Sequence, residues 1–498
     1  NTAGIAPIGS HLRYIPDFTV WNGQVVIATD EGSVQGNAFT GQPQSNLWFG
    51  EFEDLKKWGP RTAAGSIYME DAIEAGVPSD PFLINGFPRR MVHLASDLPV
   101  AFQLQIDRTG NGIFEDYKRI EVDGYASHTF PSDLDAQWIR VQADKDCLAT
   151  VSFHFSEDSY RDSSDADLFS AIAQHDDPSA LAALVFPNAQ NRDLSVVSTP
   201  GSTKKTYNFD HVDFAYKAVA DGALAVDTLS PVAMGGWGSM VTREGLGQTT
   251  LREFLTPKAE FSVDEASVLL ISEEDRKIVG KEGNRTRLRL PKGPETYNDS
   301  FEFGDPRMHR ELQSERMMAN IHGTFYEVPF WIVGKAPLYT KMRPVSTHNR
   351  QISDFTTWNG LLVLAGLKPD AEASERVYKT EDGSTALWFG GIDDLWKFGK
   401  PVGVGGPWKH TAVKAGVPSD PYLMTGYDKK TLELTADTDC TITVEIDIDH
   451  WTGFHTYKTF NVKAGEHLVY EFPEEFAAHW VRVQSDTDTK ATALFIYE

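Results

Sequence analysis

Hydrophobic and polar residues alternate with a period of two along much of the chain. The segments 102–106, 138–141 and 150–155 show this alternation, and Gly, Pro and Asp residues separate them. A period of two is typical of a strand with one buried face, and no stretch of helical length carries a clear 3.6-residue pattern. The pattern therefore predicts an all-β protein built from many short strands.

The alternating segments belong to an internal repeat, with one copy at each end of the chain. The two copies run from 11 to 155 and from 348 to 498. They share a His-x-Arg pair at His11/Arg13 and His348/Arg350, Leu-Trp-Phe-Gly at 47–50 and 387–390, and Ala-Gly-Val-Pro-Ser-Asp-Pro at 75–81 and 415–421. Self-similarity at a fixed spacing indicates that repeat-equivalent residues take equivalent places in the fold.

The length of each copy predicts the architecture. A four-stranded propeller blade takes roughly 40–65 residues with its loops, so each copy corresponds to two blades and residues 156–347 to about three more. We therefore expect a seven-bladed β-propeller, a single closed domain over residues 1–498. The alternative is a pair of β-sandwich domains flanking a linker, although strand-like runs such as 267–272 argue that the middle third is not a linker.

Charge and cysteine content narrow the classes of partner. The chain has 46 basic and 71 acidic residues, a net charge of −25, which disfavours nucleic acid and anionic membranes. No apolar run is long enough to span a membrane. Cys147 and Cys440 are not repeat-equivalent and predict two buried thiols. The chain begins at Asn1, which is typical of a processed N-terminus, so a secreted or periplasmic location is expected.

Histidines in the middle third and at the repeat boundaries are the candidates for proton transfer. His322 and Tyr326 are expected on one side of a strand, as a base and an acid, with Phe325 on the other side. His211 is a second candidate base. His348 and Arg350 are expected near the axis of the ring. In each case the alternative is a polar group that satisfies the main chain.

A run of basic residues suggests a site for an anion. Arg285, Arg287 and Arg289 alternate and should share one face, and Lys292 follows them. In an acidic chain this strip predicts a carboxylate clamp, because Arg binds carboxylates through two hydrogen bonds. A solvated edge strand is the alternative. His154 stands where the second copy has Ile496, a departure from the repeat that suggests a substrate contact or a satisfied core histidine.

Several separated motifs resemble one family of propeller enzymes. They are Leu-Trp-Phe-Gly at 47–50, Arg-Leu-Pro-Lys-Gly at 289–293, His-Gly-Thr-Phe-Tyr-Glu at 322–327, and His-Asn-Arg at 348–350. The chain resembles the seven-bladed L-rhamnose-α-1,4-D-glucuronate lyases and exo-α-L-rhamnosidases that degrade arabinogalactan and gum arabic, and more distantly the ulvan lyases. The resemblance implies a monomer acting on an anionic oligosaccharide or polysaccharide. It raises calcium as a bound ion and implies no organic cofactor.

The resemblance also bears on the reaction type. The hydrolase description of the family invokes a histidine shortly before Leu-Trp-Phe-Gly, where this chain has Gln44. A neutral amide cannot accept a proton, so we expect β-elimination that releases terminal L-rhamnose and leaves an unsaturated uronate. The hydrolase and a non-catalytic glycan-binding propeller are the alternatives. The turn at 107–112 has too few carboxylates for a calcium loop and predicts a hairpin turn.

Overall fold

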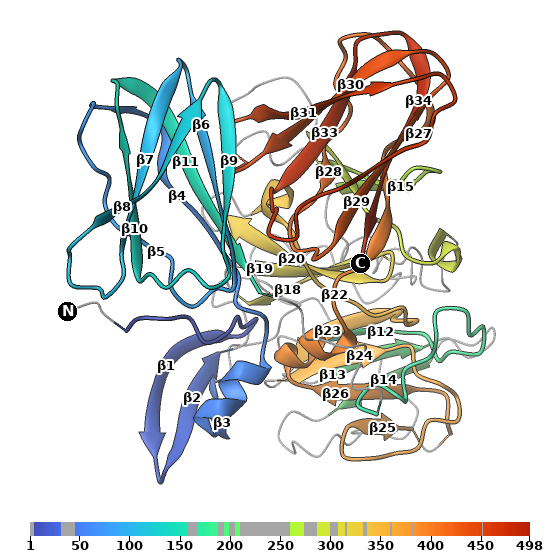
Figure 1. Cartoon of the computed structure of the whole chain (residues 1–498). Helices are drawn as coiled ribbons and strands as arrows, with labels where there is room; N and C mark the ends of the chain where they lie inside the picture. The colour runs from blue at the N-terminus through green and yellow to red at the C-terminus, as the bar shows by residue number, and fades with distance from the viewer. Residues whose placement is uncertain are drawn as a thin grey trace.

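The fold is described from a computed structural model of the chain. The described residues are 4–30, 45–157, 167–187, 194–198, 205–209, 259–272, 286–298, 307–313, 316–331, 336–358, 361–380, 382–450 and 452–498. Within them the protein is mostly β, with many antiparallel sheets and a few short 3-10 helices (Figure 1). The prediction of an all-β chain of short strands is confirmed. None of the described helices is long and apolar enough to cross a membrane.

Each repeat copy begins with a small antiparallel sheet followed by a 3-10 helix. The bounds in the first copy are β1 (Tyr14–Trp21), β2 (Gln24–Asp30), β3 (Ser45–Gly50) and η1 (Phe52–Lys57). Those in the second copy are β23 (Asp354–Trp358), β24 (Leu361–Ala365), β25 (Val377–Lys379), β26 (Ala386–Gly390) and η6 (Ile392–Phe398). The β1–β2 hairpin turns at Asn22 and Gly23, both with positive φ, as a two-residue turn requires.

The rest of the first copy is a β-sandwich, seen at the upper left of Figure 1. One sheet has the order β4 (Ala63–Ile73), β11 (Cys147–Ser156), β6 (Arg89–Ser96), β9 (Tyr125–Phe130). The other has the order β5 (Phe82–Leu83), β10 (Trp138–Ala143), β7 (Val100–Asp107), β8 (Glu115–Val122). Fully buried side chains such as Phe102, Leu104 and Val151 fill the space between the sheets.

The second copy repeats this sandwich, drawn in orange and red in Figure 1. One sheet has the order β27 (Gly403–Val413), β34 (Thr489–Tyr497), β29 (Lys430–Ala436), β32 (Leu468–Glu471). The other contains β28 (Tyr422–Leu423), β33 (Trp480–Ser485), β30 (Cys440–Asp447) and β31 (Phe454–Val462). Cys147 and Cys440 are both buried and free, as predicted.

After the small first sheet, the strand order in both copies, over 63–156 and 403–497, is that of a sandwich, the alternative considered from the sequence. A propeller blade is a meander of consecutive strands, whereas β4-β11-β6-β9 interleaves strands far apart in the chain. The assignment of two blades to each copy, 11–155 and 348–498, is therefore corrected. Strands of a blade and of a sandwich alternate with the same period and similar turns, so the pattern cannot separate them. The seven-bladed ring and the single domain stay predictions for the chain as a whole.

The middle third supplies further antiparallel sheets. Its strands are β12 (Ala183–Pro187), β13 (Leu194–Ser198), β14 (Lys205–Phe209), β15 (Ala259–Val263), β16 (Val268–Ser272), β17 (Thr286–Leu290), β18 (Arg307–Gln313), β19 (Arg316–Ile321), β20 (Thr324–Trp331), β21 (Ala336–Pro337) and β22 (Arg343–Thr347). The helices are η4 (Glu295–Asn298) and η5 (Tyr339–Lys341). β17 pairs with β28 in parallel, so β15–β17 extend a sheet of the second sandwich.

The two ends of the chain contact each other through η6. The carboxylate of Asp393 accepts the main-chain N–H of Leu12 at 2.8 Å and pairs with the guanidinium of Arg13. It also accepts the indole N–H of Trp396 at 3.1 Å. The repeat-equivalent residue in η1 is Glu53, which is exposed. One carboxylate therefore holds the start of the first copy against the second.

We predict that Asp393→Ala lowers the free energy of unfolding by about 3 kcal/mol, because it leaves three donors without their acceptor. The matched control is Glu53→Ala at the equivalent position, which should change it by less than about 0.5 kcal/mol. Urea unfolding followed by tryptophan fluorescence measures both. Equal effects of the two substitutions would contradict the role given to Asp393.

Candidate functional site

Three of the residues singled out in the sequence lie outside the described part of the chain: His211, Arg285 and Gln44. The others are placed and can be compared with their expected roles. They fall into four separate places: a polar cluster around Tyr297, a basic group around the arginine pair on β17, a hydrophobic core that contains Tyr326, and one histidine at the junction of the two sandwiches.

His322 does not lie on a strand, because it forms the turn between β19 and β20. His322 and Gly323 both have positive φ, 52° and 86°, the conformation of a two-residue hairpin. The Nδ1 atom of His322 accepts the N–H of Gly293 at 3.0 Å, so its proton sits on Nε2, which donates to Asn298 Oδ1 at 3.0 Å. Burial and the charge of Lys292 lower the pKa of His322 to about 4. Both ring nitrogens are occupied by structural partners.

His348 is also fully bonded. Its Nδ1 accepts the N–H of Arg350 at 2.9 Å, and its Nε2–H donates to Asn320 Oδ1 at 2.8 Å. Burial and the charge of Arg350 lower the pKa of His348 to about 3. The ring of Tyr297 lies 5.6 Å from His322 and 6.4 Å from His348, and its hydroxyl donates to the carbonyl of Arg350 at 2.8 Å. The structure brings these residues together, as a satisfied polar cluster.

Tyr326 belongs to a core rather than to a site with His322. Its side chain is fully buried, and its hydroxyl lies 3.4 Å from that of Tyr427. Burial raises the pKa of Tyr326 to about 12. Phe325 points into a different core, so the predicted alternation of Phe325 and Tyr326 is confirmed. The expected acid and base have different hydrogen-bond partners, because His322 lies in the turn that precedes the strand and bonds to Gly293 and Asn298.

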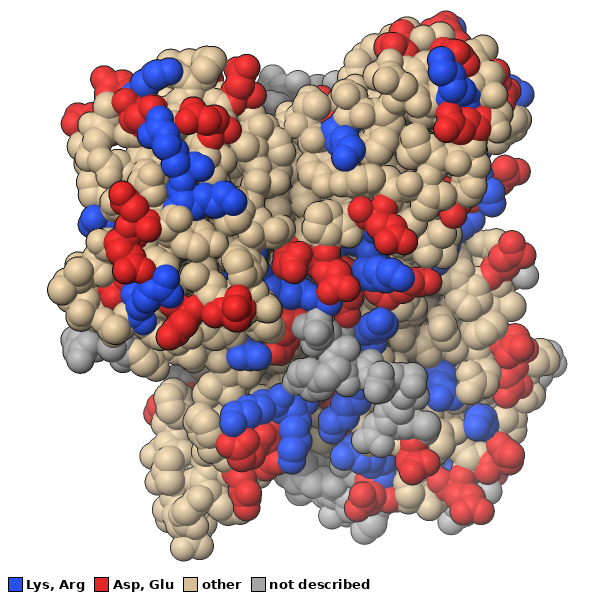
Figure 2. Space-filling view, viewed as in Figure 1, with Lys and Arg blue, Asp and Glu red and all other residues tan. Residues whose placement is uncertain are grey.

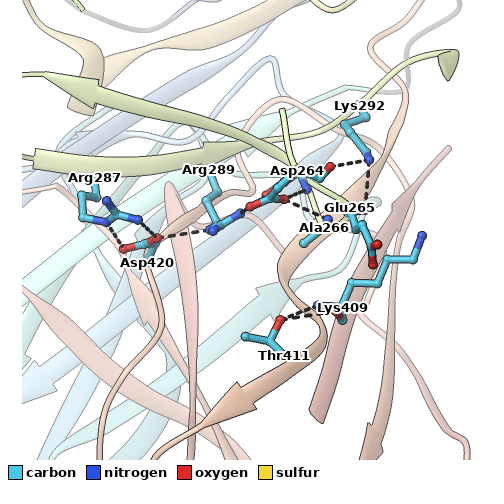
Figure 3. Close-up of polar contacts among 10 residues, drawn as sticks. Asp264, Glu265, Ala266, Arg287, Arg289, Lys292, Lys409, Thr411 and Asp420 are labelled. Atoms are coloured by element: carbon cyan, nitrogen blue, oxygen red, sulfur yellow. Dashed lines mark hydrogen bonds and ion pairs between the residues drawn. The ribbon is translucent and has the colours of Figure 1, made fainter. Parts of the chain in front are cut away.

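Figure 3 shows that the arginine strip on β17 already binds carboxylates of the chain. Arg287 holds Asp420 through Nε at 2.8 Å and Nη2 at 3.1 Å, and Arg289 reaches the same carboxylate through Nε at 3.2 Å. Arg289 Nη1 also pairs with Asp264 at 2.8 Å. The prediction that both arginines share a face is confirmed by their common partner. These ion pairs join β15–β17 to the second sandwich.

Lys292 and Arg350 also have main-chain partners. Lys292 Nζ donates to the carbonyls of Asp264 and Glu265 at 2.8 and 2.9 Å (Figure 3). Arg350 Nη1 donates to the carbonyl of Ile172 at 3.2 Å. Burial lowers the pKa of both side chains. Both groups bind main-chain carbonyls, which for Arg350 is the alternative considered from the sequence, whereas for Lys292 that alternative was a solvated edge strand.

A second group of titratable side chains lies where the two sandwiches meet. It contains five histidines, which we call the imidazole cluster: His93 on β6, His154 on β11, His450 in the β30–β31 turn, His455 on β31 and His479 just before β33. The rings of His93 and His154 lie 5.0 Å apart, and those of His450 and His479 lie 5.3 Å apart. The charge of His154 acts on the pKa of both His450 and His479, which links the two pairs.

Two of these histidines join the sandwiches. His93 Nε2–H donates to the carbonyl of Ala477 at 2.8 Å, so its Nδ1 accepts the hydroxyl proton of Tyr125, also at 2.8 Å. His154 Nε2–H donates to the carbonyl of Ile448 at 2.6 Å. Burial lowers the pKa of His154 to about 4 and that of His93 well below its ordinary value. Both rings are therefore neutral at pH 7.

Two other members of the imidazole cluster have a ring nitrogen without a hydrogen bond. The Nε2 atoms of His455 and His479 are buried, and neither has a hydrogen-bond partner among the residues that the structure describes. His455 is half-buried and stacks on Tyr125, with ring centroids 5.8 Å apart and planes at 21°. Burial lowers the pKa of His455, an effect opposed by the charges of Asp449 and Glu70. A neutral imidazole with an unbonded nitrogen beside a phenol can take up a proton.

Asp447 lies at the edge of the imidazole cluster and is perturbed in the opposite direction. Burial and the charge of Asp449 raise the pKa of Asp447 to about 7, although the N–H groups of His450 and Asp449 act to lower it. Its repeat equivalent, Asp107, accepts four N–H groups of its hairpin turn, and these bonds lower the pKa despite the cost of burial. The predicted hairpin turn at 107–112 is confirmed.

Calcium does not fit this part of the chain. The described residues contain no group of three or more His, Cys, Asp or Glu side chains placed to hold a metal ion. Asp447 Oδ1 is occupied by the N–H groups of Asp449 and His450, and both carboxylate oxygens of Asp449 accept the hydroxyl of Thr452.

Sequence reasoning found only His154 of the imidazole cluster. Of the other four, His93 belongs to the first sandwich and His450, His455 and His479 to the second, and the packing of one sandwich on the other brings the two sets together. The sequence held one signal for His479. This residue precedes Trp480, and at the equivalent place in the first copy Gln137 precedes Trp138. A search for histidines that replace another residue type at a repeat-equivalent position would have found it.

Comparisons with known proteins identify no family. No family model matches the chain, and no curated protein matches it. The solved structures that match are distant, β-rich and partly carbohydrate-active. A CBM4 structure covers 29% of this chain and 74% of its own, with 11% identity and a TM-score of 0.10. A glycoside hydrolase family 32 protein from Bifidobacterium adolescentis covers 84% of this chain and 99% of its own, with 7% identity and a TM-score of 0.17.

A third match is the α-L-rhamnosidase of Streptomyces avermitilis, solved with L-rhamnose. It covers 95% of this chain and 49% of its own, with 10% identity and a TM-score of 0.15. TM-scores this low carry no argument about fold or activity. The functional argument therefore depends on the residues of the chain.

We predict that the free energy of unfolding falls as the pH is lowered from about 6.5 to about 4. An unfolded histidine has a pKa of about 6.5, so in this pH range the unfolded chain binds protons that the buried imidazoles of the folded chain do not bind. Each such group contributes about 1.4 kcal/mol per pH unit in that window. The raised pKa of Asp447 acts in the opposite sense between pH 7 and 4 and offsets part of the loss.

His154→Gln should reduce the proton uptake on unfolding at pH 5 by about one proton, because Gln can keep a donor near Ile448 but does not titrate. Urea unfolding at a series of pH values measures the slope, and His467→Gln, which removes an exposed imidazole, is the matched control. An unchanged slope in His154→Gln would contradict a neutral buried His154.

Proposed function

We propose that this protein is a polysaccharide lyase whose reaction centre is the imidazole cluster. It would release terminal L-rhamnose from L-rhamnose-α-1,4-D-glucuronate by β-elimination and leave an unsaturated uronate. The observation that carries this proposal is the unbonded Nε2 of His455 next to the ring of Tyr125. The reaction and substrate come from the sequence resemblance, and the residues assigned to them come from the geometry.

The elimination needs a base that is neutral at pH 7 and a proton donor for the leaving oxygen. His455 Nε2 takes the C5 proton, the C5–H electron pair forms the C4=C5 double bond, and the C4–O4 bond breaks. O4 takes the hydroxyl proton of Tyr125, whose pKa is raised by burial, so that the phenol is protonated at neutral pH. The imidazolium of His455 then returns its proton to the phenolate, which restores both groups.

His93 acts as a positioning residue for Tyr125. Its Nε2–H is fixed on the carbonyl of Ala477, so its Nδ1 must accept from the Tyr125 hydroxyl. This bond orients the phenol before the reaction, and the Tyr125 hydroxyl turns from His93 Nδ1 to O4 of the substrate when it donates its proton. Asp449 and Glu70 raise the pKa of His455 through their charges and so favour the imidazolium that forms when the base takes the C5 proton.

The substrate carboxylate requires a cation, because the C5 proton is weakly acidic until the neighbouring charge is neutralised. Arg287 and Arg289 are held by Asp420 and Asp264. Lys341 lies close enough to His450 for its charge to lower the pKa of that imidazole. It is the cation that we assign to the uronate, because the neighbouring Arg343 is paired with Glu327 at 3.0 Å. Figure 2 shows charged side chains of both signs where the sandwiches meet the sheets below them.

The proposal extends to the setting of the enzyme. An anionic oligosaccharide or polysaccharide is the partner, and a secreted or periplasmic location is where such a substrate is found. Calcium has no assigned role in the reaction, because Asp447 and Asp449 near the imidazole cluster accept hydrogen bonds from donors of the chain. Activity measured after treatment with a chelator tests this.

His455→Gln and Tyr125→Phe should each lower the rate of elimination by about 100-fold or more, the usual contribution of a general base or acid. The measurement is the ultraviolet absorbance of the unsaturated uronate formed from the rhamnosyl-glucuronate disaccharide. His128→Gln is the matched control, because His128 also has a buried Nε2 without a partner but lies outside the imidazole cluster. Full activity of His455→Gln would overturn the assignment.

The same assay separates the alternatives. Rhamnose release without the ultraviolet product would indicate an exo-α-L-rhamnosidase, with Asp447 as the candidate acid because its pKa is raised to about 7. Binding of the disaccharide without any turnover would indicate a glycan-binding protein.

A further inference from the structure

The first sandwich carries a row of polar side chains on the outer side of the sheet β5-β10-β7-β8. They belong to Trp138, Arg140 and Gln142 of β10 and to Gln103 and Gln105 of β7, which pair in register. The residues between them, such as Ile139, point into the core. In Figure 1 β8 and β10 lie on the side of this sandwich that faces away from the second one. We call these five residues the glutamine face.

The second copy has an arginine at the place of Arg140, and its charge is neutralised. Arg482 Nε pairs with the carboxylate of Glu445 at 2.7 Å, and its guanidinium lies 4.1 Å from the centre of the Phe454 ring. Glu445 is the repeat equivalent of Gln105, because each lies opposite the arginine in the strand register. The second copy therefore supplies an acid where the first supplies an amide.

Arg140 keeps the geometry of Arg482 without the carboxylate. Its Nε donates to Gln105 Oε1 at 2.7 Å, and its guanidinium lies 4.2 Å from the centre of the Phe114 ring. The other end of the same amide donates to Asp116 Oδ1 at 2.8 Å, so Gln105 stands between the guanidinium and that carboxylate. Within the described ranges Arg140 forms no ion pair, and its terminal nitrogens have no hydrogen-bond partner. One positive charge is thus held in a fixed place and left uncompensated.

Trp138 differs from its repeat equivalent in the same direction. Trp480 is 2% exposed, and its indole N–H donates to the carbonyl of Thr340 in η5 at 2.8 Å. Trp138 is half-buried, and its indole N–H has no partner among the described residues. In the part of the chain that the structure describes, no element takes the place of η5 over Trp138. Part of this ring therefore remains accessible beside Arg140.

The main chain orients the two other amides of the glutamine face. Gln142 Nε2 donates to the carbonyl of Gly76 at 2.6 Å, and Gln103 Nε2 donates to the carbonyl of Leu104 at 3.0 Å. Both amide oxygens are left as acceptors, whereas the terminal nitrogens of Arg140 are donors. This combination suits a ligand that has a carboxylate, donating hydroxyl groups and an apolar ring side.

We propose that the glutamine face binds a glycan chain that contains a uronic acid. The carboxylate pairs with the terminal nitrogens of Arg140, and sugar hydroxyls donate to the amide oxygens of Gln103 and Gln142. The C–H side of the sugar ring lies against the electron-rich face of Trp138. Residues two apart on a strand are about 6.6 Å apart, so Trp138 and Arg140 can contact the ring and the carboxylate of one sugar acid. The site binds the chain and takes no part in breaking it.

Isothermal titration calorimetry of the full chain with a short glucuronate oligosaccharide tests the proposal. This probe has the carboxylate but lacks the terminal rhamnose of the proposed lyase substrate. The dissociation constant should lie between about 10 μM and about 1 mM, as expected for one ion pair and a few hydrogen bonds at an open site. A glucose oligosaccharide of the same length should bind at least about tenfold more weakly, because it has no carboxylate for Arg140.

Gln105→Glu is the decisive variant. It places beside Arg140 the acid that Glu445 places beside Arg482, so the fold already accommodates this pair. The new carboxylate neutralises Arg140 and repels the uronate, and the dissociation constant for the glucuronate oligosaccharide should rise by at least about tenfold. Arg140→Gln should have the same effect.

Arg482→Gln is the matched control, because it removes the equivalent arginine of the second copy, whose charge Glu445 already neutralises. It should leave the dissociation constant unchanged. A wild-type protein that does not bind the glucuronate oligosaccharide, equal affinity for the two oligosaccharides, or unchanged affinity in Gln105→Glu would overturn the proposal.

The glutamine face and the imidazole cluster can be tested separately. Tyr125→Phe should slow elimination and leave the binding of the glucuronate oligosaccharide intact. Gln105→Glu should weaken that binding and leave elimination of the disaccharide intact. Loss of binding in Tyr125→Phe, with binding retained in Gln105→Glu, would place the ligand at the imidazole cluster and contradict the proposal.

Discussion

Hydrogen bonds from buried imidazoles to main-chain carbonyls hold the two sandwiches together, and the site depends on this contact. His93 and His154 donate to Ala477 and Ile448, which belong to the other copy of the repeat. A ring that donates in this way is used in its neutral form, and burial enforces that form by lowering its pKa. The same contact brings β9 of the first sandwich beside β31 of the second, where Tyr125 stacks on His455.

The repeat places equivalent backbones in different surroundings, and equivalent side chains therefore differ in pKa and in exposure. Asp107 and Asp447 begin equivalent turns, yet one is stabilised as a carboxylate by four N–H groups and the other is pushed toward the neutral acid by burial beside Asp449. Leu47 and Leu387 occupy the same place in equivalent strands, and only the second is covered. Similar sequences form equivalent strands, whereas the element that packs on each strand determines the charge state or the exposure of its side chains.

The residues that looked most like a reaction centre serve the scaffold. His322 and His348 each use both ring nitrogens on main-chain or amide partners, and the arginines of β17 bind carboxylates that join two sheets. Polar groups buried without partners are costly, so most of those in a folded chain are already satisfied. The atoms that remain, such as His455 Nε2, carry more information about reactivity than the residue types do.

The sequence by itself determined the strands, their alternation and the two repeat copies, because these depend on local period and turn chemistry. It also placed Arg287 and Arg289 on one face, and Phe325 and Tyr326 on opposite faces, since side chains alternate along a strand. It did not decide between blade and sandwich, whose strands share one period. Nor did it show that His322 forms a turn or that His455 lies beside Tyr125. Those facts arise from the order in which distant strands pair and from the packing of one copy on the other, which only the tertiary structure decides.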